Sequence, residues 1–81
     1  MGLFGNSKKP EDYVYEGLAM LKQNQPKAAV NLFKKALKSD PKNVTALYNQ
    51  GLALNQMRKY QDAITCFDSV IEINPKDAPS Y

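Results

Sequence analysis

The side chains that could carry out chemistry are few in this sequence of 81 residues. Cys66 is the one thiol, and no histidine is present to activate it as a nucleophile. A single cysteine without histidine cannot supply the ligands of a zinc site, and no glycine-rich loop lies between a strand and a helix to hold a phosphate. We therefore expect a protein that is not an enzyme and that uses no metal or cofactor. A lone thiol is typical of a reduced compartment, so we expect a cytoplasmic location.

Two clusters of charge are candidate sites. Glu11, Asp12 and Glu16 lie at the start of an expected helix, where the helix dipole favours acids, so capping is a simpler interpretation than a metal or acid–base site. The basic cluster is either a solvated helix face or a weak nucleic-acid site, and it consists of Lys27, Lys34, Lys35 and Lys38. A net charge of +3, from 11 Lys and Arg against 8 Asp and Glu, is too small to favour nucleic acid.

The positions of all these residues follow a repeat of 34 residues. The segment DPKN at 40–43 returns as NPKD at 74–77, and the same shift aligns a Gly-Leu-Ala triplet at 17–19 with another at 51–53. Further pairs related by this shift are Ala29 with Ala63, Phe33 with Phe67 and Pro41 with Pro75. A fixed period of this length is typical of stacked helical units, so the chain is interpreted as a duplication.

Each unit is predicted to contain two helices. Apolar residues recur at spacings of three and four, and prolines separate the periodic stretches: Pro10 and Pro26 suit the first turn of a helix, whereas Pro41 ends one. Asn43 can cap the following helix by accepting a backbone N–H. The predicted helices cover residues 11–24, 26–39 and 44–57, and a fourth begins at about residue 61.

The spacing also predicts how the helices pack. Gly17 and Gly51 are poor helix formers, so we expect them where a partner helix approaches too closely for a β-carbon, with the equivalent alanines, Ala29 and Ala63, on the facing helix. Two lysines on the second helix of the first unit are replaced by acids at the equivalent positions of the second unit. We therefore expect ion pairs between the second helices of neighbouring units. These charged pairs are Lys34 with Asp68 and Lys38 with Glu72.

The predicted domain organisation is a flexible N-terminal tail over 1–9, a first unit over 10–43 and a second over 44–77. Residues 78–81 would begin a third unit or form a truncated cap. Arrays of this kind usually need roughly three units, so we expect the fourth helix to expose apolar residues where a fifth would lie. Either a longer chain continues the array or another copy covers that face. No stretch of about 18 apolar residues is present, so we expect no membrane span.

These residues resemble the tetratricopeptide repeat family, whose pattern places a large, a small and a large residue on the first helix, followed by Ala, an aromatic, a small residue and Pro. The first unit matches with Tyr13, Gly17, Met20, Ala29, Phe33, Ala36 and Pro41. The second matches with Leu47, Gly51, Leu54, Ala63, Phe67, Val70 and Pro75. The resemblance implies an all-α fold in which antiparallel helix pairs stack as a short right-handed solenoid.

The resemblance further implies a non-enzymatic protein-interaction module or scaffold that binds a partner peptide in a concave groove, as the N-terminal part of a longer array. The groove positions of the family fall in the first unit on Val14, Tyr15, Leu18, Leu21 and Lys22. In the second unit they fall on Tyr48, Asn49, Leu52, Asn55 and Gln56. The alternatives are a homo-oligomer that associates through the uncapped fourth helix and a weak nucleic-acid binder that uses the basic cluster.

Overall fold

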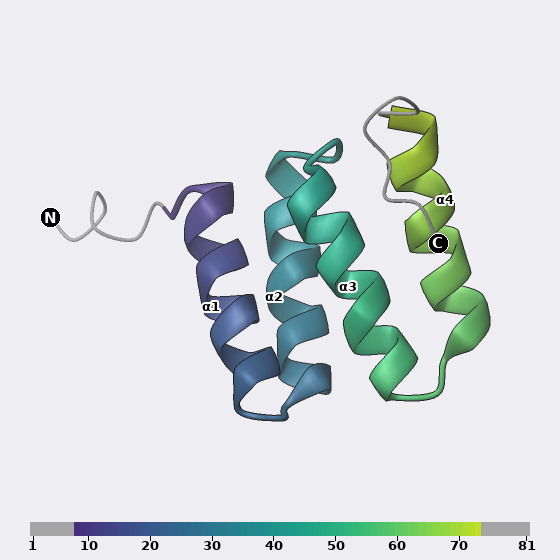
Figure 1. Cartoon of the computed structure of the whole chain (residues 1–81). Coiled ribbons are helices and arrows are strands. Elements are labelled where there is room, and N and C mark those ends of the chain that lie inside the picture. The colour runs from purple at the N-terminus through teal and green to yellow at the C-terminus, as the bar shows by residue number, and fades with distance from the viewer. Residues whose placement is uncertain (1–7, 74–81) are drawn as a thin grey trace, which may run out of the picture.

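The computed structural model describes residues 8–73, and within this range the chain is entirely helical apart from short turns (Figure 1). The helices are α1 (Pro10–Lys22), α2 (Pro26–Ser39), α3 (Val44–Gln56) and α4 (Tyr60–Ile73). The prediction of an all-α helical-repeat fold is confirmed. The predicted start of a third unit at 78–81, and most of the predicted tail, lie outside the described residues.

The helix ends follow from local chemistry. Pro10 and Pro26 begin α1 and α2, because proline suits a first turn where its missing N–H has no partner to lose. The Asn43 side chain caps α3 by accepting the Ala46 N–H at 2.9 Å. Asn24 and Arg58, one repeat apart, have φ values of 61° and 64°. The left-handed conformation at these two residues ends the preceding helices. α1 therefore ends two residues before the predicted position 24, and α3 ends one residue before the predicted position 57.

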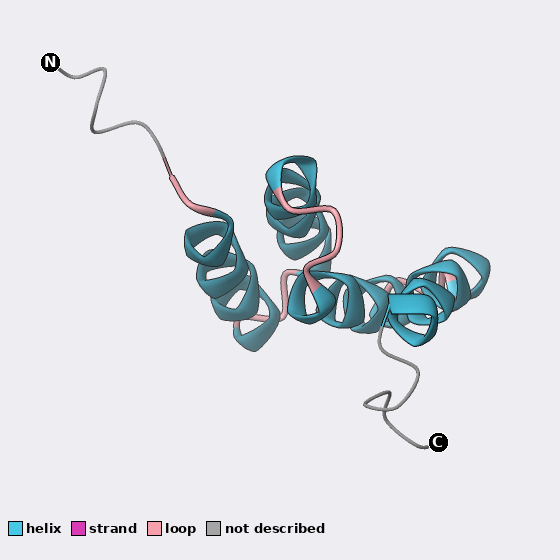
Figure 2. Cartoon of the chain, turned by 90° about the horizontal axis from the view of Figure 1, so that it is seen from above, coloured by secondary structure: helices cyan, strands magenta, loops and turns pink. Residues whose placement is uncertain are grey.

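Each helix packs against its neighbour in sequence, and α1 also touches α3. Viewed from above in Figure 2, α2 lies to one side of α1 and α3, and α4 lies beside α3. Within the described residues the backbones of α2 and α4 do not approach closely, and no ion pair joins Lys34 to Asp68 or Lys38 to Glu72, so the expected pairing is wrong. The described ion pair is instead Lys8 with Glu16, at the start of α1.

One aromatic ring in each unit fills the space beside a glycine. A β-carbon built on Gly17 would lie 2.6 Å from Cε1 of Phe33, and one built on Gly51 would lie 2.6 Å from Cε1 of Phe67. The prediction that a facing helix comes too close to these glycines for a β-carbon is therefore confirmed. The closest atoms belong to the phenylalanine rings of the facing helices and not to Ala29 or Ala63.

The two rings differ in their surroundings. Phe33 is fully buried, because α1 and α3 both pack against α2. Phe67 is only partly buried, since α3 is the one described helix that packs against α4. The expected exposure of apolar residues on α4 is confirmed, because Tyr60, Ile64 and Ile71 are all exposed.

We predict that Gly17→Ala destabilises the protein more than Gly51→Ala. The added methyl at residue 17 collides with an enclosed ring, which costs about 1–3 kcal/mol and outweighs the gain in helix propensity of about 1 kcal/mol. At residue 51 the Phe67 ring is less enclosed and has more room to shift, so the net change in unfolding free energy is closer to zero. Urea denaturation of both variants measures the difference, and equal losses would show that the surroundings of the ring do not matter.

Candidate functional site

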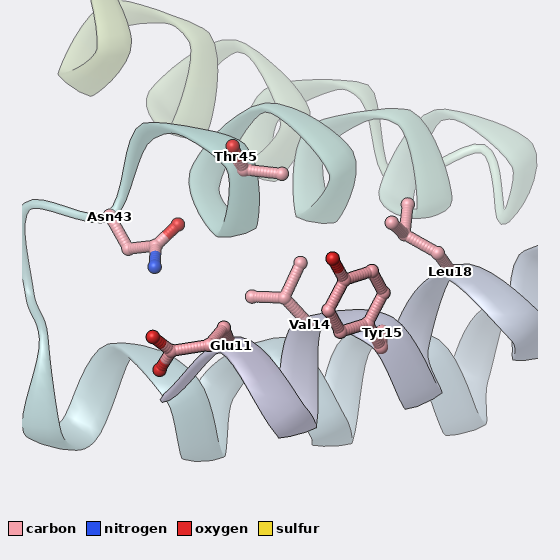
Figure 3. A pocket seen from close by; sticks show the side chains of 6 residues that line it. All are labelled: Glu11, Val14, Tyr15, Leu18, Asn43 and Thr45. Carbon is pink, nitrogen blue, oxygen red and sulfur yellow. The ribbon is translucent and has the colours of Figure 1, made fainter. Parts of the chain in front are cut away.

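A hollow of about 220 Å³ lies between α1 and the start of α3. Its walls are the side chains of Glu11, Val14, Tyr15, Leu18, Asn43 and Thr45. In Figure 3 Val14 and Tyr15 rise from α1 towards α3, and Glu11 lies at the end nearest Asn43. The α1 residues recur at spacings of three and four, which places them on one face of that helix.

A second hollow of about 460 Å³ continues along α1. It is lined by Tyr15, Leu18, Ala19, Leu21 and Lys22, so Tyr15 and Leu18 belong to both hollows. We call the combined surface the α1 groove. Tyr15 lies in the middle of the groove, and the residue is 72% exposed. The groove is apolar along its length, with the acid Glu11 at one end and the base Lys22 at the other.

The structure brings together all five groove residues predicted in the first unit. It does not add the five from the second unit to the same hollows. Tyr48 is half-buried, and its ring packs against Phe67 with a centroid distance of 5.7 Å. The Asn49 amide donates a hydrogen bond of 2.8 Å to the Thr45 carbonyl in its own helix. Leu52 is half-buried, whereas Asn55 and Gln56 are exposed.

Sequence reasoning missed three residues that line the first hollow. Glu11 was interpreted as a capping acid and Asn43 as a helix cap, and Thr45 was not considered. A signal for Glu11 was present, because it precedes Tyr15 by one helical turn and so shares its face. Asn43 and Thr45 reach the hollow because α3 packs beside α1. No local sequence pattern predicts this packing of the two helices.

The acids at the start of α1 have separate roles. The Asp12 carboxylate accepts the Lys9 backbone N–H at 3.1 Å, which fits the capping interpretation. Glu16 accepts a hydrogen bond from the Lys8 ammonium, which raises the pKa of Lys8. Glu11 instead borders the groove. No group of acids, cysteine or histidine in residues 8–73 is arranged to hold a metal ion.

A separate hollow of about 310 Å³ lies between α2, α3 and α4. It is lined by Lys34, Gln50, Leu54, Asp62, Thr65 and Cys66. Burial raises the pKa of the Cys66 thiol, and the Asp62 charge raises it further, while Lys34 acts in the opposite direction. The thiol is therefore protonated near neutral pH, which disfavours a nucleophilic role. None of the described helices is both long enough and apolar enough to cross a bilayer.

Paired antiparallel helices that recur along the chain define a helical-repeat protein. A family model described as "Tetratricopeptide repeat" matches residues 16–78, which is more than half of the chain. The protein therefore belongs to the tetratricopeptide repeat family, as the sequence predicted. The fold is similar to the crystal structure of a tetratricopeptide repeat domain protein from Salinibacter ruber, with a TM-score of 0.76 and 22% identity over 90% of this chain and 81% of that one. No curated protein matches the sequence.

We predict that Cys66 reacts slowly with a thiol reagent in the native protein and rapidly in denaturant, because burial keeps the thiol protonated and covered. The native rate should rise with pH around a pKa above the usual cysteine value. Labelling with iodoacetamide, followed by mass spectrometry, measures both rates. In a Cys66→Ala background, Thr65→Cys places a thiol at an exposed position and should react fast. Equal native rates for the two thiols would contradict the burial of Cys66.

Proposed function

We propose that this protein is an interaction module whose working surface is the α1 groove, which holds a short segment of a partner protein. Tetratricopeptide repeats are in general protein-interaction modules and are in general not catalytic. The observation that supports the groove is Tyr15, a large side chain that remains 72% exposed between two hollows. Tyrosine at such a position offers a rigid ring for contact and a hydroxyl for hydrogen bonding.

The composition of the groove indicates what kind of segment it would hold. Leu18 and Leu21, which are half-buried, favour apolar side chains in the middle of the partner segment, whereas Val14 is buried in the core and only borders the groove. Glu11 favours a basic residue at one end and Lys22 an acidic residue at the other. Eleven helical positions separate these two charges, so they lie about 16 Å apart, which about five extended residues can span.

The second-unit positions extend the proposed surface along α3. Asn55 and Gln56 are exposed amides that can pair with the backbone of a longer segment. Tyr48 and Asn49 are less direct candidates than these two amides. Tyr48 supports Phe67, and the Asn49 amide already donates within its own helix. Removing the Tyr48 ring would therefore lower stability as well as binding.

No observation favours the nucleic-acid alternative. Lys35 lies over the Tyr13 ring at 5.9 Å, and Lys34 lines the hollow that also contains Asp62, so both have neighbours within the molecule. The four lysines of the basic cluster are exposed. The described hollow that one of them lines also contains an acid, which disfavours a nucleic-acid base or phosphate there. The expectation that the chain is the N-terminal part of a longer array stays a prediction.

We predict that Tyr15→Ala weakens binding of a groove peptide by on the order of 2 kcal/mol, as expected for a central aromatic anchor. The peptide is one selected from a displayed random library against the whole chain, and calorimetry measures its affinity. The thermal midpoint should hardly change, because the ring is mostly exposed.

Tyr60→Ala is the matched control. Tyr60 is 54% exposed on α4, away from the groove, so the same change there should leave peptide affinity unaltered. If Tyr15→Ala has no effect, or if the two variants lose affinity equally, the α1 groove is not the binding surface.

A further inference from the structure

An apolar stripe runs along one face of α4. Its residues, Tyr60, Ile64, Phe67 and Ile71, follow one another at spacings of four, three and four, which places them on a single side of the helix. Tyr60, Ile64 and Ile71 are 54%, 49% and 36% exposed, and Phe67 is partly buried. We call this set the α4 stripe.

The same positions in the first unit form an interface within the molecule. Val30 is equivalent to Ile64 and is only 6% exposed, and Phe33 is equivalent to Phe67 and is fully buried. Since α3 packs on α2 and no described helix packs on the far side of α4, the presence of a covering helix accounts for this difference. A surface of this kind on a small protein favours association.

We propose that a second copy of this chain covers the α4 stripe, with the two α4 helices antiparallel about a two-fold axis. In such an arrangement each stripe meets its own copy in reverse, so Tyr60 lies opposite Ile71 and Ile64 lies opposite Phe67 of the second copy. The stripe is therefore complementary to itself, which a symmetric dimer requires.

The charges near the ends of α4 complement one another in the same arrangement. Arg58 and Lys59 precede the helix and outnumber Asp62 in its first turn, whereas Asp68 and Glu72 lie in its second half. Antiparallel packing brings the basic end of one copy beside the acidic end of the other, and the register that matches the stripes sets Lys59 level with Glu72. The helix dipoles also oppose one another.

Head-to-tail stacking of copies is disfavoured by the charge on α1. In α3 the residues Ala46, Gln50 and Ala53 are buried, whereas their equivalents in α1, which no described helix precedes, are exposed or half-buried. Those equivalents are Asp12, Glu16 and Ala19. If α1 covered the α4 stripe of another copy as α3 covers α2, two carboxylates would be buried, at a large desolvation cost.

The dimer should be weak. The 14 residues of α4 are about 21 Å long, and one helix pair of that length buries less than the roughly 1,200–2,000 Å² of a stable interface. Sedimentation equilibrium of the whole chain, from about 10 μM to about 1 mM, should therefore show a reversible monomer–dimer equilibrium. Ile64→Glu should raise the dissociation constant by more than about tenfold, because it places a charge in the centre of the stripe.

Two further variants separate this proposal from others. Tyr15→Glu changes the α1 groove and should leave the dimer intact, so a failed groove and a failed dimer are distinguishable. Asp68→Lys with Glu72→Lys should weaken the dimer at low salt, and adding Arg58→Glu with Lys59→Glu should restore it. Circular dichroism checks that each variant keeps its helices.

A monomer at every concentration would overturn the proposal and leave the α4 stripe to a different chain. Oligomers that grow beyond two copies would overturn it in favour of head-to-tail stacking. An unchanged dissociation constant in Ile64→Glu, or no restoration by the second charge reversal, would also overturn the antiparallel arrangement.

Discussion

The structure depends on the contact between a glycine and an aromatic ring, which occurs once in each unit. Phe33 lies against Gly17 and Phe67 lies against Gly51 at a distance that no β-carbon would allow. Because the ring occupies the space of the absent side chain, the first helix of each unit packs closely on the second. That close packing lets a chain of this length bury a continuous core from α1 to α4.

The same contact has a different environment in each unit, and this difference produces the two surfaces described above. In the first unit α3 encloses Phe33 and leaves a groove beside α1, where Tyr15 stands exposed. In the second unit no described helix lies beyond α4, so Ile64 and Ile71 face outward next to Phe67. One end of the array is acidic at Asp12 and Glu16, and the other is apolar.

These ends and the groove imply a division of roles between separate faces. The α1 groove combines apolar side chains with opposite charges at its two ends, which suits a short segment that enters in one direction. The α4 stripe is apolar, and in the proposed antiparallel arrangement it matches itself under a two-fold axis. Since α3 lies between the two surfaces, the proposed ligand on α1 and the proposed second copy on α4 would contact different residues.

The sequence by itself determined the repeat, the four helices and the family, because these depend on spacing, prolines and small residues that act within a few turns. The resemblance to the family also pointed to Val14, Tyr15 and Leu18 as groove positions, and these three residues line one hollow beside α1. Only the tertiary structure decided which atoms fill the space beside Gly17 and that Asn43 and Thr45 join the groove. It also decided that α2 and α4 stay apart, so that Lys34 and Asp68 do not pair. The reason is that these outcomes depend on the relative placement of helices from different units, which the energy of the whole packed core sets and no local pattern encodes.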